Sequence, residues 1–283
     1  KNIMNDNYSV RYAIGPRETN QMGTKALRDE FLIDQVFGID QINWIYTHYD
    51  RYVVGGVIPK KTVVKLETID PLKANFFLER REMGIINVGG NGSVTADGVN
   101  YILGYKEALY LGRGTKEVSF SSEEISSPAK FYINSTPAHQ AYPSRKVGRD
   151  EAEIVDLGTP ETANARTIRK LIVNSILPTC QLQMGMTELK SGSVWNTMPA
   201  HVHDRRMEVY FYFEVPEDQA VCHFMGAPNE TRHIWMANEQ AVISPPWSIH
   251  AGSGTSNYIF IWGMAGENLD YGDMDGCPIP SLR

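Results

Sequence analysis

The residues of this chain best suited to chemistry are three histidines and one glutamate in its second half. His201 and His203 form an HxH pair, Glu208 follows, and His250 ends the later string Ser-Pro-Pro-Trp-Ser-Ile-His. Imidazole nitrogens and a carboxylate are the ligands expected for a divalent first-row metal such as zinc, iron, manganese or nickel. The pattern therefore predicts a metal site made by these four residues.

Their spacing indicates which elements must position them. In an extended chain residues i and i+2 point the same way, so one strand can direct both His201 and His203 at one ion. The residues after His203 leave room for a turn that returns Glu208 on the neighbouring strand. Two consecutive prolines before Trp247 predict a rigid turn that places His250 at the start of a later strand.

The same alternation gives candidates for proton transfer. If Glu208 faces the interior of a barrel, Tyr210 and Tyr212 face it too, whereas Val209 and Phe211 face the packing layer. Glu208, Tyr210, Tyr212 and a metal-bound water are all candidates for the general base, and the tyrosines can equally be core aromatics. The catalytic residue thus stays open at this point.

Four further side chains are candidates for substrate binding: Arg205, Arg206, Arg232 and Trp247. A guanidinium group forks well onto a carboxylate, so any of the three arginines can bind an acidic substrate group. Each can equally form an ion pair within the protein. Trp247 can line the cavity or pack under its own turn.

The rest of the chain predicts an all-β fold with few, short helices. Short apolar or alternating runs bounded by turn residues recur over residues 40–140 and 168–264, which is typical of antiparallel barrels or sandwiches. Examples are residues 43–46, 52–58, 84–88, 93–95, 101–103, 108–111, 117–120 and 255–262. The one predicted helix spans about residues 24–32.

We expect two domains of similar size, at residues 1–140 and 168–283, joined by a connector at 141–167. A weak internal repeat supports this division. An acidic residue followed by two arginines precedes an apolar run both at residues 79–81 and at residues 204–206. Residues 106–110 likewise resemble residues 238–243. Only the second copy carries the histidine pair, so we expect the first domain to lack metal ligands.

The composition of the chain limits the classes of binding partner that can be expected. With 27 Lys and Arg against 33 Asp and Glu, the formal charge is −6, which disfavours nucleic acid or an anionic membrane as the main partner. A small anionic substrate stays compatible, because a few local arginines suffice. There are three cysteines and no CxxC motif. Together with the absence of an apolar signal or an 18-residue apolar run, this predicts a cytoplasmic protein.

The metal motifs resemble the two signatures of the cupin superfamily, HxHx3–4E and PxGxxH, in which a small β-barrel holds a metal ion. The chain departs from them in having Trp247 at the glycine position. Longer strings narrow the resemblance to the 5-keto-4-deoxyuronate isomerase family. The strings that carry it are residues 76–84, 195–203, 205–213 and 238–250.

The resemblance implies a bicupin of two tandem antiparallel β-barrels of jelly-roll type, with one zinc ion per subunit, held by His201, His203, Glu208 and His250. It also implies a homohexamer that acts in pectin and uronate breakdown. The implied reaction is an aldose–ketose isomerisation of 5-keto-4-deoxyuronate, a sugar acid, to 3-deoxy-D-glycero-2,5-hexodiulosonate. The resemblance leaves open whether zinc contacts the substrate and whether the hydrogen moves as a proton or as a hydride.

Two alternatives are kept beside this function. The first is another metal-dependent cupin enzyme, either an iron dioxygenase or a different sugar isomerase. The second is a sugar-binding cupin without catalysis, although the sequence shows no helix-turn-helix segment or basic patch that would fit a regulator.

Overall fold

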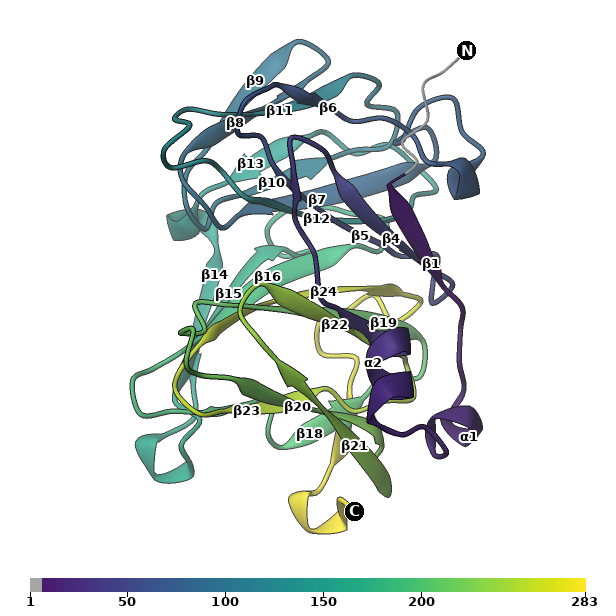
Figure 1. The fold of residues 1–283 in the computed structure, drawn as a ribbon, viewed down its shortest axis with the longest axis vertical. Coiled ribbons are helices and arrows are strands. Elements are labelled where there is room, and N and C mark those ends of the chain that lie inside the picture. The colour runs from purple at the N-terminus through teal and green to yellow at the C-terminus, as the bar shows by residue number, and fades with distance from the viewer. Residues whose placement is uncertain (1–6) are drawn as a thin grey trace. The chain divides into compact units, whose positions relative to one another are not determined.

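The computed structural model describes residues 7–283 and consists mainly of strands (Figure 1). Its two α-helices are α1 (Pro16–Thr19) and α2 (Thr24–Phe31), so the predicted helix over residues 24–32 is confirmed. Short 3-10 turns lie at Asp70–Leu72, Arg149–Glu151, Pro160–Thr162 and Ile279–Ser281. The fold is all-β, as the sequence predicts.

The described chain divides into two compact units. The first contains residues 7–11, 35–152 and 171–183, and the second contains residues 12–34, 153–170 and 184–283. Unlike the contiguous division expected from sequence, the units exchange segments. Strand β2 (Leu32–Ile33) pairs with β22 (Gln240–Ser244) in the second unit, while the backbone N–H groups of Cys180 and Leu182 donate to the Glu82 carboxylate in the first.

The first unit holds two facing sheets. The larger has the order β1-β4-β5-β12-β7-β10-β13, with β3 beside β5, and the smaller has the order β6-β11-β8-β9. The larger sheet contains β1 (Tyr8–Arg11), β3 (Gly38–Ile39), β4 (Asn43–Thr47), β5 (Val53–Ile58), β7 (Arg81–Asn87), β10 (Ala108–Leu111), β12 (Phe131–Pro137) and β13 (Arg145–Val147). The smaller contains β6 (Val64–Lys65), β8 (Gly92–Ala96), β9 (Val99–Leu103) and β11 (Val118–Ser122). One apolar core fills the space between them, because buried side chains of both sheets belong to it, including Ile85 and Phe120.

The second unit is built in the same way. Its larger sheet has the order β14-β15-β16-β24-β19-β22-β2, its smaller sheet has the order β17-β23-β20-β21, and β18 pairs with β25. The larger sheet adds β14 (Glu153–Leu157), β15 (Arg166–Ile172), β16 (Gln183–Leu189), β19 (Arg206–Phe213) and β24 (Ile259–Gly266). The others are β17 (Trp195–Asn196), β18 (Ala200–Val202), β20 (Val221–Ala227), β21 (Glu230–Met236), β23 (Ala251–Gly254) and β25 (Asp275–Cys277).

The strand orders confirm the internal repeat. Strands β7 to β12 and β19 to β24 run through equivalent positions: β12-β7-β10 matches β24-β19-β22, and β11-β8-β9 matches β23-β20-β21. The acidic-Arg-Arg strings enter β7 and β19, and the second similar pair of strings enters β10 and β22. The weak sequence similarity therefore marks strands with the same place in two copies of one topology.

One predicted strand is displaced. The run over residues 255–262 does not form a single strand, because residues 251–254 form β23 in the smaller sheet and the closing strand β24 begins only at Ile259. Residues 255–258 connect the two. The predicted connector at 141–167 contains two strands, β13 and β14.

Candidate metal centre and its cavity

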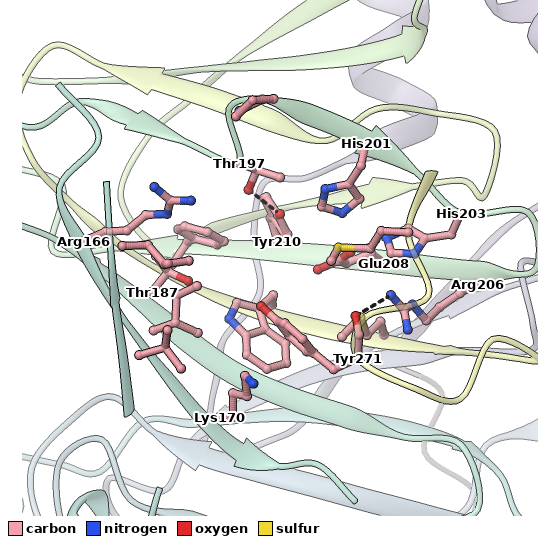
Figure 2. Close-up of a pocket in the computed structure, with 18 residues that line it drawn as sticks. Arg166, Lys170, Thr187, Thr197, His201, His203, Arg206, Glu208, Tyr210 and Tyr271 are labelled. Atoms are coloured by element: carbon pink, nitrogen blue, oxygen red, sulfur yellow. Dashed lines mark hydrogen bonds and ion pairs between the residues drawn. The ribbon is translucent and has the colours of Figure 1, made fainter. Parts of the chain in front are cut away.

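The four predicted ligands come together from three places in the second unit. His201 lies on β18, opposite Gly276 of β25, and His203 follows directly after that strand. Glu208 lies on β19, while His250 immediately precedes β23. One nitrogen or oxygen atom of each lies within 4.8 Å of those of the others. These residues therefore form a group that could hold a metal ion, and Figure 2 shows three of them at one side of a cavity.

The distances between donor atoms describe a tight group. His250 Nε2 lies 2.9 Å from His201 Nε2 and 3.0 Å from Glu208 Oε2. His203 Nε2 lies 3.4 Å from the same carboxylate oxygen, and it has no hydrogen-bond partner of good geometry among residues 7–283. Nitrogens directed at one another and at one carboxylate, with the buried His203 Nε2 left without a partner, fit a shared cation between them.

The outer ring nitrogens fix two of the imidazoles. His203 Nδ1 donates to the carbonyl oxygen of Asp273 at 2.9 Å, and His250 Nδ1 is hydrogen-bonded with Ser244 Oγ at 3.2 Å. Such contacts select the tautomer that leaves Nε2 free as a ligand. The imidazoles are thus oriented toward the centre by the protein itself.

Burial and mutual charge also favour metal binding over protonation. Burial, together with the neighbouring His250 and His203, lowers the pKa of His201 to about 2. Although burial alone raises the pKa of the Glu208 carboxyl, His250 and His203 hold it well below its usual value. A neutral His201 imidazole and an ionised Glu208 carboxylate are in the protonation states that a divalent ion requires of its ligands.

The proline-rich segment forms the predicted turn. The N–H of Ser248 donates to the carbonyl of Pro245 at 3.0 Å, and the carbonyl of Pro246 accepts from His203 N–H at 3.2 Å. Ser248 is fully buried, and its Oγ accepts from Gly226 N–H. The turn therefore ties His250 and His203 to the same backbone framework.

Three members of the group, His201, His203 and Glu208, lie in the wall of a cavity of about 230 Å³. The lining residues are Val155, Leu157, Arg166, Ile168, Lys170, Thr187, Thr197, Pro199, His201, His203, Arg206, Glu208, Tyr210, Phe260, Trp262, Met264, Tyr271 and Met274. Aromatic and apolar side chains with a few polar groups are typical of a small-molecule site. The cavity can thus hold a small polar ligand against the four-residue group.

The two predicted tyrosines have different surroundings. Tyr210 lines the cavity, and its hydroxyl is hydrogen-bonded with Thr197 Oγ1 at 2.7 Å. Tyr212 is absent from the cavity wall, and its hydroxyl is hydrogen-bonded with His223 Nδ1 at 2.8 Å. Burial and the charge of Glu208 raise the pKa of Tyr210 well above 10. Alternation predicted the strand face correctly, but only Tyr210 reaches the cavity.

Three of the predicted substrate contacts do not reach this cavity. Arg205 is exposed and lies 3.6 Å from the carboxylate of Glu267. Arg232 donates to the carbonyl of Asn20 and to Glu230, whereas the indole N–H of Trp247 donates to the carbonyl of Ile14 at 3.2 Å. Each of these side chains is engaged by a partner outside this cavity, so their contact with the substrate stays a prediction.

Arg206 does line the cavity, but its guanidinium is bonded elsewhere. The side chain is fully buried and donates to the carbonyl oxygens of Asn268, Asp270, Tyr271 and Asp273 at 2.6 to 3.3 Å. Asp273 is also the acceptor for His203 Nδ1. Arg206 therefore supports the segment that orients a ligand residue.

Sequence reasoning missed several cavity residues, above all Arg166 and Lys170 on β15. With Ile168 between them, they alternate along one strand face, and all three line the cavity. The period of two was visible in the sequence. Charged residues in such a pattern are ordinarily assigned to a solvated face, so the pattern alone did not indicate a cavity.

Taken together, the two copies of one all-β topology and the three-histidine, one-glutamate group define a bicupin with a candidate metal centre in its second unit. A model of the KduI/IolB family matches residues 33–275, and the chain belongs to this family.

Relatives of known name extend over the whole chain. A protein of Formosa agariphila named 4-deoxy-L-threo-5-hexosulose-uronate ketol-isomerase is 64% identical over 99% of this chain and 100% of its own length. Proteins of the same name from Bacteroides fragilis and Lachnoclostridium phytofermentans are 59% and 53% identical, over 99% and 97% of this chain and 100% and 99% of their own. The chain is thus an enzyme, an isomerase.

Solved structures support the fold. An IolB-like protein of Salmonella typhimurium matches with a TM-score of 0.66 at 17% identity, over 80% of this chain and 87% of its own. An oxalate decarboxylase of Lactobacillus farciminis matches with a TM-score of 0.55 at 10% identity, over 80% and 79%. In the described residues, no helix has the length and apolar character needed to cross a membrane.

Proposed function

We propose that this chain is a zinc-dependent aldose–ketose isomerase that converts 4-deoxy-L-threo-5-hexosulose uronate to 3-deoxy-D-glycero-2,5-hexodiulosonate in the breakdown of pectin and other uronates. The observation that carries the proposal is the group of His201, His203, Glu208 and His250, three of which line a cavity that also holds cationic side chains. The names of the relatives, at 53 to 64% identity over nearly whole chains, support the substrate.

Zinc fits the group by its chemistry. Three neutral imidazoles and one carboxylate suit a borderline-soft ion without redox activity, and an isomerisation needs no electron acceptor. When bound, zinc would supply a Lewis acid that polarises the substrate carbonyl. We propose one ion per subunit, held by these four residues.

The reaction moves hydrogen from C2 to C1 and a proton between the two oxygens. Glu208 is the only carboxylate among the residues that line the cavity. As a ligand its basicity is reduced, which favours a different proton carrier. We assign the transfer of the proton between the two substrate oxygens to Tyr210, whose hydroxyl lies in the wall and is hydrogen-bonded with Thr197. The phenol can donate a proton to a substrate oxygen and recover it in the same turnover.

The apolar part of the wall would exclude water. Phe260, Trp262 and Met264 of β24 line the cavity, and Tyr210 packs on Phe260 with ring centroids 4.5 Å apart. A dry wall strengthens the hydrogen bonds made to the developing charge on the substrate oxygens. It would also protect the reactive dicarbonyl compound from side reactions.

The test is conversion by the purified protein. Protein stripped by a chelator and the same protein reloaded with zinc would be incubated with the uronate under air and without oxygen, and the product identified by NMR. We expect conversion only after reloading and equally without oxygen, whereas an iron dioxygenase would stop. Solvent deuterium at the product's hydroxymethyl carbon, which derives from substrate C1, would assign the hydrogen movement to a proton path. Absence of conversion by fully zinc-loaded protein would refute the proposed function.

Two further proposals concern the cell. The three cysteines, Cys180, Cys222 and Cys277, are free thiols in the structure, which supports a reducing compartment such as the cytoplasm. Assembly as a homohexamer rests on the family resemblance. Gel filtration with light scattering measures the assembly directly.

A further inference from the structure

The cavity wall carries more positive than negative charge. Its cations are Arg166, Lys170 and Arg206, and its only carboxylate is Glu208, which belongs to the histidine group. A cationic cavity with apolar walls favours an anionic ligand, because its charges are poorly solvated. Which cation meets that anion depends on the partners that each already has.

Two of the three cations are held by several protein contacts, although the buried Nε of Arg206 has no hydrogen-bond partner among residues 7–283. Lys170 Nζ lies 2.6 Å from Glu153 Oε1 and 4.5 Å from the ring centroid of Tyr271. The Arg206 guanidinium donates to several backbone carbonyls, as described above. Neither can turn to a ligand without losing these contacts.

Arg166 differs from both. Its Nη1 donates to the carbonyl of Asn164 at 2.9 Å, and within the described chain Nε and Nη2 have no hydrogen bond or ion pair. The side chain is half-buried, and this burial lowers the pKa of the guanidinium. A partly desolvated guanidinium with open donors is stabilised by a planar, two-oxygen anion.

The position of Arg166 fits one end of the proposed substrate. In Figure 2 Arg166 lies across the cavity from His201 and His203, with Thr197 and Tyr210 between them. In the hexosulose uronate the reacting carbons C1 and C2 are at one end of the chain, and the keto group and carboxylate of C5 and C6 are at the other. A substrate that spans the cavity with C1 and C2 at the histidine group therefore places its carboxylate at Arg166.

We propose that Arg166 binds the substrate carboxylate and thereby sets both the orientation of the substrate and the preference for a uronate over a neutral sugar. This inference rests on the proposed function. Lys170 contributes charge to the same side of the cavity but keeps its pairing with Glu153.

The test compares variants with two substrates. Arg166→Gln and Arg166→Lys would be assayed with the free acid and with its C6 methyl ester, which keeps the carbon skeleton without the charge. Arg169→Gln is the matched control, because Arg169 lies on the same strand, pairs with Glu188 and does not line the cavity. Zinc content and thermal unfolding would be measured for each variant.

We expect Arg166→Gln to raise KM for the free acid about 10- to 100-fold, as for loss of a charge-assisted hydrogen bond, with a much smaller change in kcat. Its activity with the methyl ester should stay close to wild type, so the preference for acid over ester disappears. Arg166→Lys should lie between, and Arg169→Gln should behave as wild type. Retention of the acid preference in a folded, zinc-loaded Arg166→Gln protein would overturn the inference.

Binding measurements separate this inference from the proposed function. Calorimetric titration with pyruvate, a small 2-oxocarboxylate, requires no turnover. Weaker binding to Arg166→Gln than to wild type supports the carboxylate site even if zinc-loaded wild type converts nothing, whereas equal binding to both contradicts it. If Arg166→Gln fails to fold, the same comparison is made with Arg166→Lys, for which an unchanged affinity and an unchanged KM would refute the role.

Discussion

Replacement of Tyr210 by Phe separates proton transfer from packing, because Tyr212 provides a matched control on the same strand. Both side chains are buried, and each hydroxyl is hydrogen-bonded at similar distance, with Thr197 Oγ1 at 2.7 Å for Tyr210 and with His223 Nδ1 at 2.8 Å for Tyr212, which the Asn196 side chain also contacts. Loss of either hydroxyl should lower the free energy of unfolding by about 1 to 2 kcal/mol, since one buried hydrogen bond is removed and its partner is left unsatisfied.

The effects on turnover should differ. Only Tyr210 lines the cavity, so loss of its hydroxyl as a proton carrier should reduce kcat about 10²- to 10⁴-fold, equivalent to about 3 to 5 kcal/mol in the barrier. Tyr212→Phe should keep kcat within about threefold of wild type, because its hydroxyl donates no proton to the substrate. The two variants would then match in stability and differ in rate by orders of magnitude.

The assay follows product formation at saturating uronate, with zinc per chain measured in the same samples and unfolding followed in urea. Wild-type turnover by Tyr210→Phe at full zinc occupancy would refute the assignment of Tyr210. An equal loss of kcat in both variants would show that aromatic packing around β19, and not proton transfer, sets the rate.

Three further results are expected. His203→Ala removes one of four converging donors and should weaken zinc binding about 100-fold or more in a chelator competition. The control His233→Ala, at an exposed position, should leave zinc binding unchanged. Equal zinc affinities of the two variants would contradict the ligand assignment. Glu82→Gln should lower the unfolding free energy, measured in urea, by about 2 to 4 kcal/mol, because one carboxylate oxygen that accepts hydrogen bonds from the Tyr110 hydroxyl and the Cys180 N–H becomes an amide donor. The control Tyr110→Phe removes only one of these bonds and should cost about 1 kcal/mol. Equal losses in the two variants would argue against a central role for the carboxylate. Burial, with His250, lowers the pKa of His223 from 6.5 to about 3, so the unfolded chain binds a proton below pH 6.5 that the folded chain does not. The unfolding free energy of metal-free protein should therefore fall as the pH drops from 6.5, by up to about 1.4 kcal/mol per pH unit from this group, and His223→Asn should show a shallower slope; identical slopes would refute the buried neutral imidazole.

Local patterns were enough to predict most of the fold and the four-residue group. The period of two places His201 and His203 on one side of an extended chain, and it puts Glu208 and Tyr210 on the same face of β19. Alternation and turn residues likewise marked the positions of strands such as β4, β5 and β10. These features depend on neighbours in sequence, so no tertiary information was needed.

Nearness along the chain did not place the other candidates at the cavity. Arg205 is close to the ligands in sequence, yet the alternation of β19 and the turn before it direct its guanidinium toward Glu267 at the surface. Trp247 is adjacent to His250 in the motif but reaches Ile14, which no sequence pattern connects to it. Long-range packing decided both cases.

The sequence by itself determined the chemistry available: a three-histidine, one-glutamate donor set, an all-β framework and a repeated strand order. Only the tertiary structure decided which charges face the substrate. Arg166 and Lys170 enter the cavity because β15 lies in the same sheet as β19, separated from it by β16 and β24. The partner of Lys170 comes from the neighbouring strand β14, and those of Arg206 come from segments far away in the chain, whereas Arg166 keeps open donors. Pairing across a sheet and burial of charge are set by the whole fold, and residue spacing alone does not contain them.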